Sequence, residues 1–246
     1  MKYLKISIVF TIFLLLFFFV SRNRIENFPS IKFCDNFSYY ETKMICYAFF
    51  TGNTTYCKFT PNFKLECYSF ATLDNLGNCG SYKDKFVKAE CTKNLAIKEK
   101  DPSICDRLED KSLQETCFSS LPYLYYDFYS SEECERILHE SARYTCMAIV
   151  NKNSSFCNFI VLEPWGKNAC KALAEKNPGS CNSSSCYESF AILYKDPSFC
   201  SHIDSPWDRA RCVALSSKNF KYCKEFNGIS KDLCRLYVLK AKALGI

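Results

Sequence analysis

The chain has 246 residues, 18 of them cysteine, and a formal net charge of +6. Residues 1–33 contribute +4 of that charge, so the rest of the chain carries only +2. A charge this small excludes the clustered basic face that nucleic-acid binding requires. The high and even cysteine content indicates an oxidising compartment, in which disulfides replace part of a hydrophobic core.

The N-terminal segment, residues 1–24, is predicted to be a membrane anchor or signal segment that contacts the membrane through residues 4–20. The apolar run Ile6–Val20 is interrupted by only two polar residues. Its length is short for a transmembrane helix and also fits a cleavable signal peptide. Bulky side chains at the end of the run, where cleavage requires small ones, favour an uncleaved anchor. A short connector, residues 25–33, follows.

Residues 34–246 are predicted to form a cysteine-rich α-helical repeat ectodomain. In one unit, Asp196 is a candidate N-cap and Pro197 occupies the first helical position. A break at Asp204–Pro206 then separates Cys200 from Cys212. Two antiparallel helices that meet at this break would place the two cysteines opposite each other, as a disulfide requires.

The unit recurs about every 23 residues along the ectodomain, and a period of this length indicates stacked supersecondary units. We therefore predict an all-α solenoid of about nine disulfide-stapled helical hairpins after an N-terminal transmembrane helix. Pairing within each unit uses every cysteine. The alternative, in which the second cysteine of each unit pairs with the first cysteine of the next unit, would leave Cys34 and Cys234 without partners. Pairing stays open in the second and seventh repeats, whose spacings are irregular. The expected bridge cysteines are Cys34, Cys46, Cys57, Cys67, Cys79, Cys91, Cys105, Cys117, Cys134, Cys146, Cys157, Cys170, Cys181, Cys186, Cys200, Cys212, Cys223 and Cys234.

The longest connection between units lies between Cys117 and Cys134 and is rich in aromatic residues. Amphipathic rings supply large contact areas at low entropic cost, so this segment is a candidate partner-binding surface. Alternatively, the rings cover a longer joint between repeats. The candidate residues are Tyr123, Tyr125, Tyr126, Phe128 and Tyr129.

Signals for catalysis or cofactor binding are weak. The chain lacks the close cysteine pairs of structural zinc sites and any glycine-rich phosphate loop, and it has only two histidines, His139 and His202. We therefore predict no enzyme activity and no cofactor. Cys181 and Cys186, with four residues between them, are the nearest approach to a thiol redox or metal-binding pair.

Two further features concern the surface and the end of the chain. The last helix is expected over Leu233–Ala243, with Lys240 and Lys242 near the negative end of its dipole. Four Asn-x-Ser/Thr sequences are candidate glycosylation sites in an exported protein, although turn or capping chemistry explains them equally well. They begin at Asn36, Asn53, Asn153 and Asn182.

The segments Asp101–Cys105 and Asp196–Cys200 share the pattern Asp-Pro-Ser-x-Cys, each with a second cysteine twelve residues later. This pattern resembles the repeats of uncharacterised exported cysteine-rich proteins, particularly from archaea. In architecture it loosely resembles Sel1-like repeats, without their glycine and alanine signature. The resemblance implies disulfide-stapled helical hairpins and brings no assigned activity.

Together these features predict a membrane-anchored scaffold outside the cytoplasm, at the cell surface. Stacked hairpins expose long concave surfaces, so the expected partner is a protein or a glycan. The alternatives are a thiol redox or metal-binding protein that uses Cys181 and Cys186, and a secreted inhibitor or effector if the N-terminal segment is cleaved.

Overall fold

The computed structural model describes residues 29–128, 130–160 and 164–246. The chain divides into two compact units, Met1–Asn36 and Phe37–Ile246. The described part contains helices and no strand, which confirms the all-α class. None of its helices is long and apolar enough to cross a bilayer. The expected membrane segment, residues 1–24, lies outside the described residues.

Most of the short helices hold the first cysteine of a unit, and they alternate along the chain with α-helices that hold the second. Three short helices contain no cysteine: Pro61–Phe63, Pro122–Asp127 and Pro178–Ser180. The short ones are mostly 3-10 helices, because five or six residues between a cap and a break allow fewer than two turns. They are η1 (Ile31–Asn36), η2 (Thr54–Phe59), η3 (Pro61–Phe63), η4 (Thr72–Ser81), η5 (Pro102–Arg107), η6 (Pro122–Asp127), α6 (Ser131–Glu135), η7 (Ser154–Phe159), η8 (Pro178–Ser180), η9 (Pro197–His202) and η10 (Tyr222–Glu225). The longer helices are α2 (Tyr40–Thr51), α3 (Lys64–Ala71), α4 (Lys85–Glu99), α5 (Lys111–Ser119), α7 (Glu140–Val150), α8 (Pro164–Glu175), α9 (Ser184–Tyr194), α10 (Pro206–Ser217) and α11 (Gly228–Leu244).

The predicted capping residues start the short helices. The Asp196 carboxylate accepts the backbone N–H of Ser198 at 2.9 Å, and Asp101 accepts that of Ser103 at 3.0 Å. Asn53 and Asn153 cap η2 and η7 in the same way. A free backbone N–H is thus satisfied at the start of each of these helices.

The residue before several of these caps is a lysine in the left-handed region of backbone conformation. Five lysines have φ between 52° and 55°: Lys100, Lys152, Lys176, Lys195 and Lys218. This conformation ends the preceding α-helix and costs a non-glycine residue about 1 kcal/mol. This recurrent helix end was not predicted from the sequence, because the residue that usually marks it is glycine.

Replacing Lys195 by glycine is expected to raise the free energy of unfolding by up to about 1 kcal/mol, since glycine adopts positive φ without the steric cost. Lys195 is exposed and makes no ion pair among the described residues. Urea unfolding measures the effect. Lys98→Gly, at an exposed and helical position of α4, is the control and should destabilise. Destabilisation by both substitutions would contradict the expectation.

Within the unit Phe37–Ile246, disulfides connect the first cysteine of a repeat to the second, which lies in the α-helix that follows. Every cysteine is oxidised and at most 8% exposed, which with 18 cysteines gives nine bridges. The observed pairs confirm that cysteines pair within each unit, and they include the pairs of the second and seventh repeats, which the sequence left open. They are Cys57–Cys67, Cys79–Cys91, Cys105–Cys117, Cys134–Cys146, Cys157–Cys170, Cys181–Cys186, Cys200–Cys212 and Cys223–Cys234, while Cys34 and Cys46 are also oxidised.

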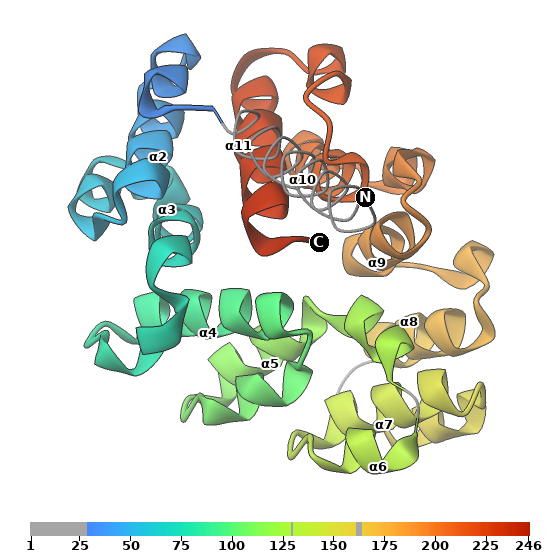
Figure 1. The fold of residues 1–246 in the computed structure, drawn as a ribbon. Helices are drawn as coiled ribbons and strands as arrows, with labels where there is room; N and C mark the ends of the chain where they lie inside the picture. The colour runs from blue at the N-terminus through green and yellow to red at the C-terminus, as the bar shows by residue number, and fades with distance from the viewer. Residues whose placement is uncertain (1–28, 129, 161–163) are drawn as a thin grey trace, which may run out of the picture. The chain divides into compact units, whose positions relative to one another are not determined.

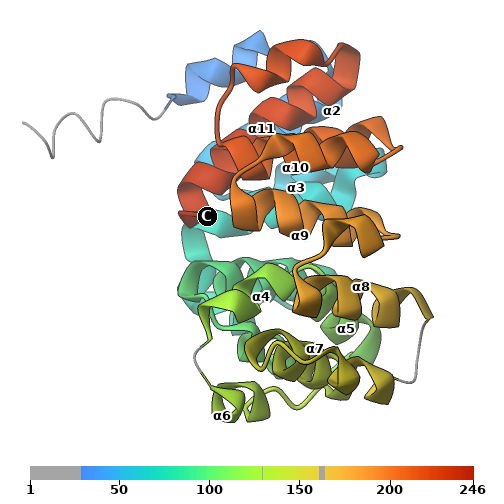
Figure 2. The same ribbon diagram turned by 90° about the vertical axis from the view of Figure 1, so that its right-hand side faces the viewer.

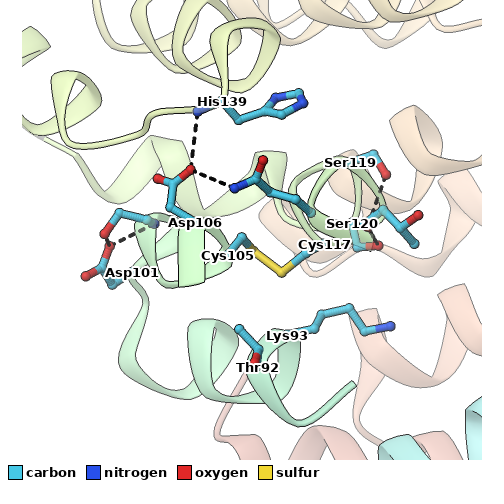
Figure 3. Close-up of a disulfide and its surroundings, with 12 residues drawn as sticks. Thr92, Lys93, Asp101, Cys105, Asp106, Cys117, Ser119, Ser120 and His139 are labelled. Carbon is cyan, nitrogen blue, oxygen red and sulfur yellow. Dashed lines mark hydrogen bonds between the residues drawn. A yellow bond between two sulfur atoms is a disulfide. The ribbon is translucent and has the colours of Figure 1, made fainter. Parts of the chain in front are cut away.

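Polar contacts connect one unit to the next beside these bridges. Figure 3 shows Asp106, adjacent to the Cys105–Cys117 bridge, with its carboxylate directed at the backbone of His139. The same carboxylate accepts the N–H of Leu138 at 2.8 Å. Burial, opposed by these hydrogen bonds, raises the pKa of Asp106. The fourth and fifth repeats are thereby held in a fixed register.

Within the unit Phe37–Ile246 the helices form a closed ring of contacts. Each longer helix contacts the next, and α11 returns to contact α2 and α4 (Figure 1). In the side view of Figure 2, α10 and α11 lie next to each other, and α11 is the one that contacts α2. Phe63, before α3, lies 5.2 Å from Trp207 of α10, and Phe70 lies 5.4 Å from Tyr237 of α11, measured between ring centroids.

The Asp232 side chain on α11 forms hydrogen bonds that hold this helix to the start of α2. Its carboxylate is 1% exposed and accepts the backbone N–H groups of Ser38 at 2.9 Å and Tyr39 at 3.1 Å. It also accepts the hydroxyl of Thr42 at 3.1 Å. At the start of α11, Gly228 has φ of +57°, and a Cβ there would lie 3.0 Å from the Tyr39 hydroxyl. Both features bring the first and last helices of this unit together.

Candidate functional site

A central cavity of about 260 Å³ lies where the inner faces of the ring meet. The longer helices α3, α4, α5, α9, α10 and α11 line it, with η6 and the C-terminal Ile246. The exposed residues Leu65 and Ser120 stand at its rim. Its wall combines hydroxyl groups and apolar side chains with six charged residues: Glu66, Glu90, Lys93, Glu188, Arg211 and Lys240.

The residues of the wall occupy recurrent positions around the second cysteine of a unit. In α4, Glu90 precedes Cys91 by one residue and Lys93 follows it by two. Positions three apart share one helical face, so this face turns inward wherever the disulfide holds the helix in the same orientation. This register could have predicted the cavity lining from the sequence. The equivalent residues elsewhere are Glu66, Ser69, Ser119, Ser185, Glu188 and Arg211.

Two of the cations in the wall have carboxylate partners. Arg211 donates to both oxygens of Glu188, from Nε at 3.1 Å and from the terminal nitrogen at 2.8 Å. Lys93 lies 2.7 Å from Glu90. The negative charge of Glu188 raises the pKa of Arg211 despite burial. Burial alone would raise the pKa of Glu90, but Lys93 and Lys240 together hold it below its usual value.

Lys240 differs from these two cations because it makes no ion pair within the described residues. Its ammonium donates to the Ser69 hydroxyl and lies 5.6 Å from the ring centre of Phe70. The side chain is only 6% exposed. Burial, together with the nearby charge of Lys93, lowers the pKa of Lys240 to about 7. Lys242 lies in the last turn of α11, near the negative end of its dipole as predicted. Lys240 lies four residues before the end of the same helix, and its side chain lines the cavity.

Two buried tyrosines complete the wall. Tyr123 is 9% exposed and Tyr237 is 8% exposed. Neither hydroxyl has a hydrogen-bond partner among the described residues. Burial raises the pKa of both phenols, so both are neutral donors at physiological pH. Among the described residues, the wall of the cavity therefore holds two charged groups without an ion pair, Lys240 and Glu66, and two tyrosine hydroxyls without a hydrogen-bond partner.

The aromatic segment predicted to bind a partner is largely internal. Tyr123 and Tyr125 are buried, Tyr126 and Phe128 are half-buried, and Tyr129 lies outside the described residues. Tyr126 donates its hydroxyl to the backbone carbonyl of Leu173. These side chains cover a joint between repeats, which was the alternative interpretation, and partner binding by them stays a prediction.

The remaining candidates are separate from the cavity. Cys181 and Cys186 form a disulfide, and thiol or metal chemistry at this pair stays a prediction. No cluster of three metal-ligating side chains occurs in the part of the chain that the structure describes. His139 accepts the N–H of Ala142 at the start of α7, and His202 stacks on a tyrosine.

The four candidate glycosylation sites are exposed, so the fold leaves room for a glycan at each of them: Asn36, Asn53, Asn153 and Asn182. Two of these side chains also cap 3-10 helices, as the alternative interpretation predicts. Glycosylation stays a prediction.

The architecture defines a disulfide-stapled helical-repeat protein, and its nine bridges indicate an oxidising environment outside the cytoplasm. No protein-family model, no curated protein and no solved structure matches the chain. The resemblance of its Asp-Pro-Ser-x-Cys units to exported cysteine-rich repeat proteins stays a prediction.

Proposed function

We propose that this protein is a non-catalytic binding module that a membrane anchor holds outside the cytoplasm, and that a small polar ligand occupies its central cavity. Its hairpins are a short solenoid whose ends meet. The observation that carries the proposal is Lys240, a buried cation in the wall of the cavity that forms no ion pair with a carboxylate among the described residues. Such a group is costly unless a partner compensates it.

This proposal narrows the scaffold role that the sequence suggests. The inner faces of the hairpins, which an open array would present to a large partner, surround a cavity of about 260 Å³. A volume of this size, near the lower end for ligand pockets, suits a ligand of a few heavy atoms or the end group of a larger protein or glycan.

Filling the cavity with an indole is expected to abolish ligand binding. Leu215 is half-buried in the wall, so Leu215→Trp places its ring in the cavity. Saturation-transfer NMR against a mixed library of small polar fragments measures binding. Fragments should bind the native protein and the control Leu138→Trp, whose site is 72% exposed, and should not bind Leu215→Trp. Equal binding to all three proteins would contradict the proposal.

A further inference from the structure

We propose that the ligand of the central cavity is a neutral sugar, held through its hydroxyl groups. This inference rests on the proposed function and adds the chemical class of the ligand. Three features of the wall support it: the balance of its charged side chains, the two kinds of hydrogen-bonding group that it presents, and its apolar surface.

The charged side chains of the wall cancel one another. Three are cations and three are carboxylates: Lys93, Arg211, Lys240, Glu66, Glu90 and Glu188. Arg211 pairs with Glu188, and Lys93 pairs with Glu90. The remaining cation, Lys240, is attracted by both Glu90 and Glu66. A ligand with a net charge would leave that charge uncompensated in a buried site, so the balance favours a neutral ligand.

The wall presents hydrogen-bond donors at two tyrosines. Tyr123 on η6 and Tyr237 on α11 are both more than nine-tenths buried, and neither hydroxyl has a hydrogen-bond partner among the described residues. Burial raises the pKa of both phenols, so each keeps a hydrogen to donate. A buried hydroxyl without a partner costs free energy, which a bound acceptor would recover.

The wall presents hydrogen-bond acceptors at its serines. The hydroxyls of Ser119, Ser120 and Ser189 each donate to a backbone carbonyl three or four residues earlier in the chain. A hydroxyl has one hydrogen and two lone pairs, so these serines have only acceptor capacity left. The carboxylate of Glu66, which makes no ion pair among the described residues, adds a further acceptor.

These groups lie on different elements around the cavity. The donors are on η6 and α11, and the acceptors are on α3, α9 and the C-terminal end of α5. A ligand that meets them needs polar groups on several sides, and those groups must both donate and accept. A hydroxyl does both, whereas a carbonyl only accepts, and a sugar carries a hydroxyl on nearly every ring carbon.

The apolar part of the wall suits the carbon face of a sugar ring. Ile97, Ile192 and Leu215 line the cavity together with the two tyrosines. A pyranose has apolar C–H faces and a polar edge, so it can contact both kinds of surface at once. The cavity of about 260 Å³ has the volume of about nine waters at about 30 Å³ each, which is room for one hexose of about twelve heavy atoms.

The experiment is a saturation-transfer NMR titration of the full chain with glucose, galactose and mannose. It is run at pH 6, below the pKa of about 7 for Lys240, so that all three cations of the wall are charged. The matched probes for each hexose are its 2-amino derivative, its uronate, and cyclohexanol, a ring of the same size with one hydroxyl. At least one hexose should bind, and its matched probes should bind at least about tenfold more weakly, equivalent to about 1.4 kcal/mol.

Two variants connect binding to the hydroxyl donors. Tyr123→Phe and Tyr237→Phe each remove one hydroxyl and keep the ring, so each should weaken binding of the hexose about threefold to tenfold. Neither hydroxyl has a partner among the described residues, so neither variant should lower the free energy of unfolding. Tyr40→Phe, at an exposed position outside the cavity, is the control and should bind the hexose as the native protein does. Unchanged affinity in both cavity variants would overturn the proposed mode of binding.

Failure of this inference differs from failure of the proposed function. Absence of binding by all three hexoses would overturn the sugar class, as would a charged derivative or cyclohexanol that binds as tightly as the hexose. In either case, fragments that bind the native protein and not Leu215→Trp would still support the proposed function. Hexose binding that Leu215→Trp leaves unchanged would place the ligand outside the cavity and overturn both proposals.

Discussion

Asp232→Ala is expected to lower the free energy of unfolding by about 3 kcal/mol, because it leaves two backbone donors at the closure of the ring without their acceptor. These donors are the backbone N–H groups of Ser38 and Tyr39. The Thr42 hydroxyl also loses the carboxylate but keeps a second acceptor, the backbone carbonyl of Tyr39 at 2.9 Å. Thr42 is fully buried, so water cannot readily replace the carboxylate. Urea unfolding with the disulfides intact measures the loss.

The matched control is Asp204→Ala. Asp204 is exposed, and its side chain has no hydrogen-bond partner among the described residues, so its loss should cost less than about 0.5 kcal/mol. Hydrogen exchange adds a local readout, because amides in α2 should exchange faster in Asp232→Ala while those in α7 keep their protection. Equal losses in the two variants would show that the Asp232 contacts add no stability to the ring.

Lys240→Met is expected to raise the free energy of unfolding at pH 6 by about 1–3 kcal/mol, because it replaces a buried, unpaired charge by an apolar side chain of similar length. The gain should shrink as pH rises. The native protein loses the Lys240 proton near pH 7, whereas the unfolded chain keeps it until about pH 10.5. The unfolded state therefore binds more protons in this interval, and native stability rises by up to about 1.4 kcal/mol per pH unit.

Urea unfolding at pH 6, 7.5 and 9 measures this dependence. Below pH 7 the contribution of Lys240 is constant, because both states are protonated. Lys242→Met is the control, since Lys242 is exposed on the same helix and should leave the dependence on pH unchanged. Parallel curves for the native protein and Lys240→Met over this range would contradict the assigned burial of the charge.

Local signals in the sequence predicted the repeating unit because the interactions that form it, helix capping and disulfide pairing, join residues within about 23 positions of one another. Asp101 and Asp196 cap the short helices that they were expected to start. The bridge Cys200–Cys212 joins two helices across the predicted break. Capping and short-range pairing depend on neighbours along the chain, so a sequence pattern contains them in full.

The candidate site was harder to predict because its parts come from distant repeats. Lys240 looked like a charge at the end of a helix, yet its contacts are Ser69 and Phe70, about 170 residues earlier in the chain. Tyr123 and Tyr125 looked like a surface patch and proved to be internal. In both cases the side chain is buried by residues of other repeats, which the local sequence does not identify.

By itself, the sequence determined the all-α class, the oxidising environment, and the pairing of cysteines within units outside the second and seventh repeats, because each depends on composition or on contacts a few residues apart. Only the tertiary structure decided that the hairpins from Phe37 onward close into a ring and enclose charge. Closure depends on how small rotations between successive units add up, and no single unit encodes that sum. The hydrogen bond between Ser38 and Asp232, 194 residues apart, is one of the contacts that form when the ring closes.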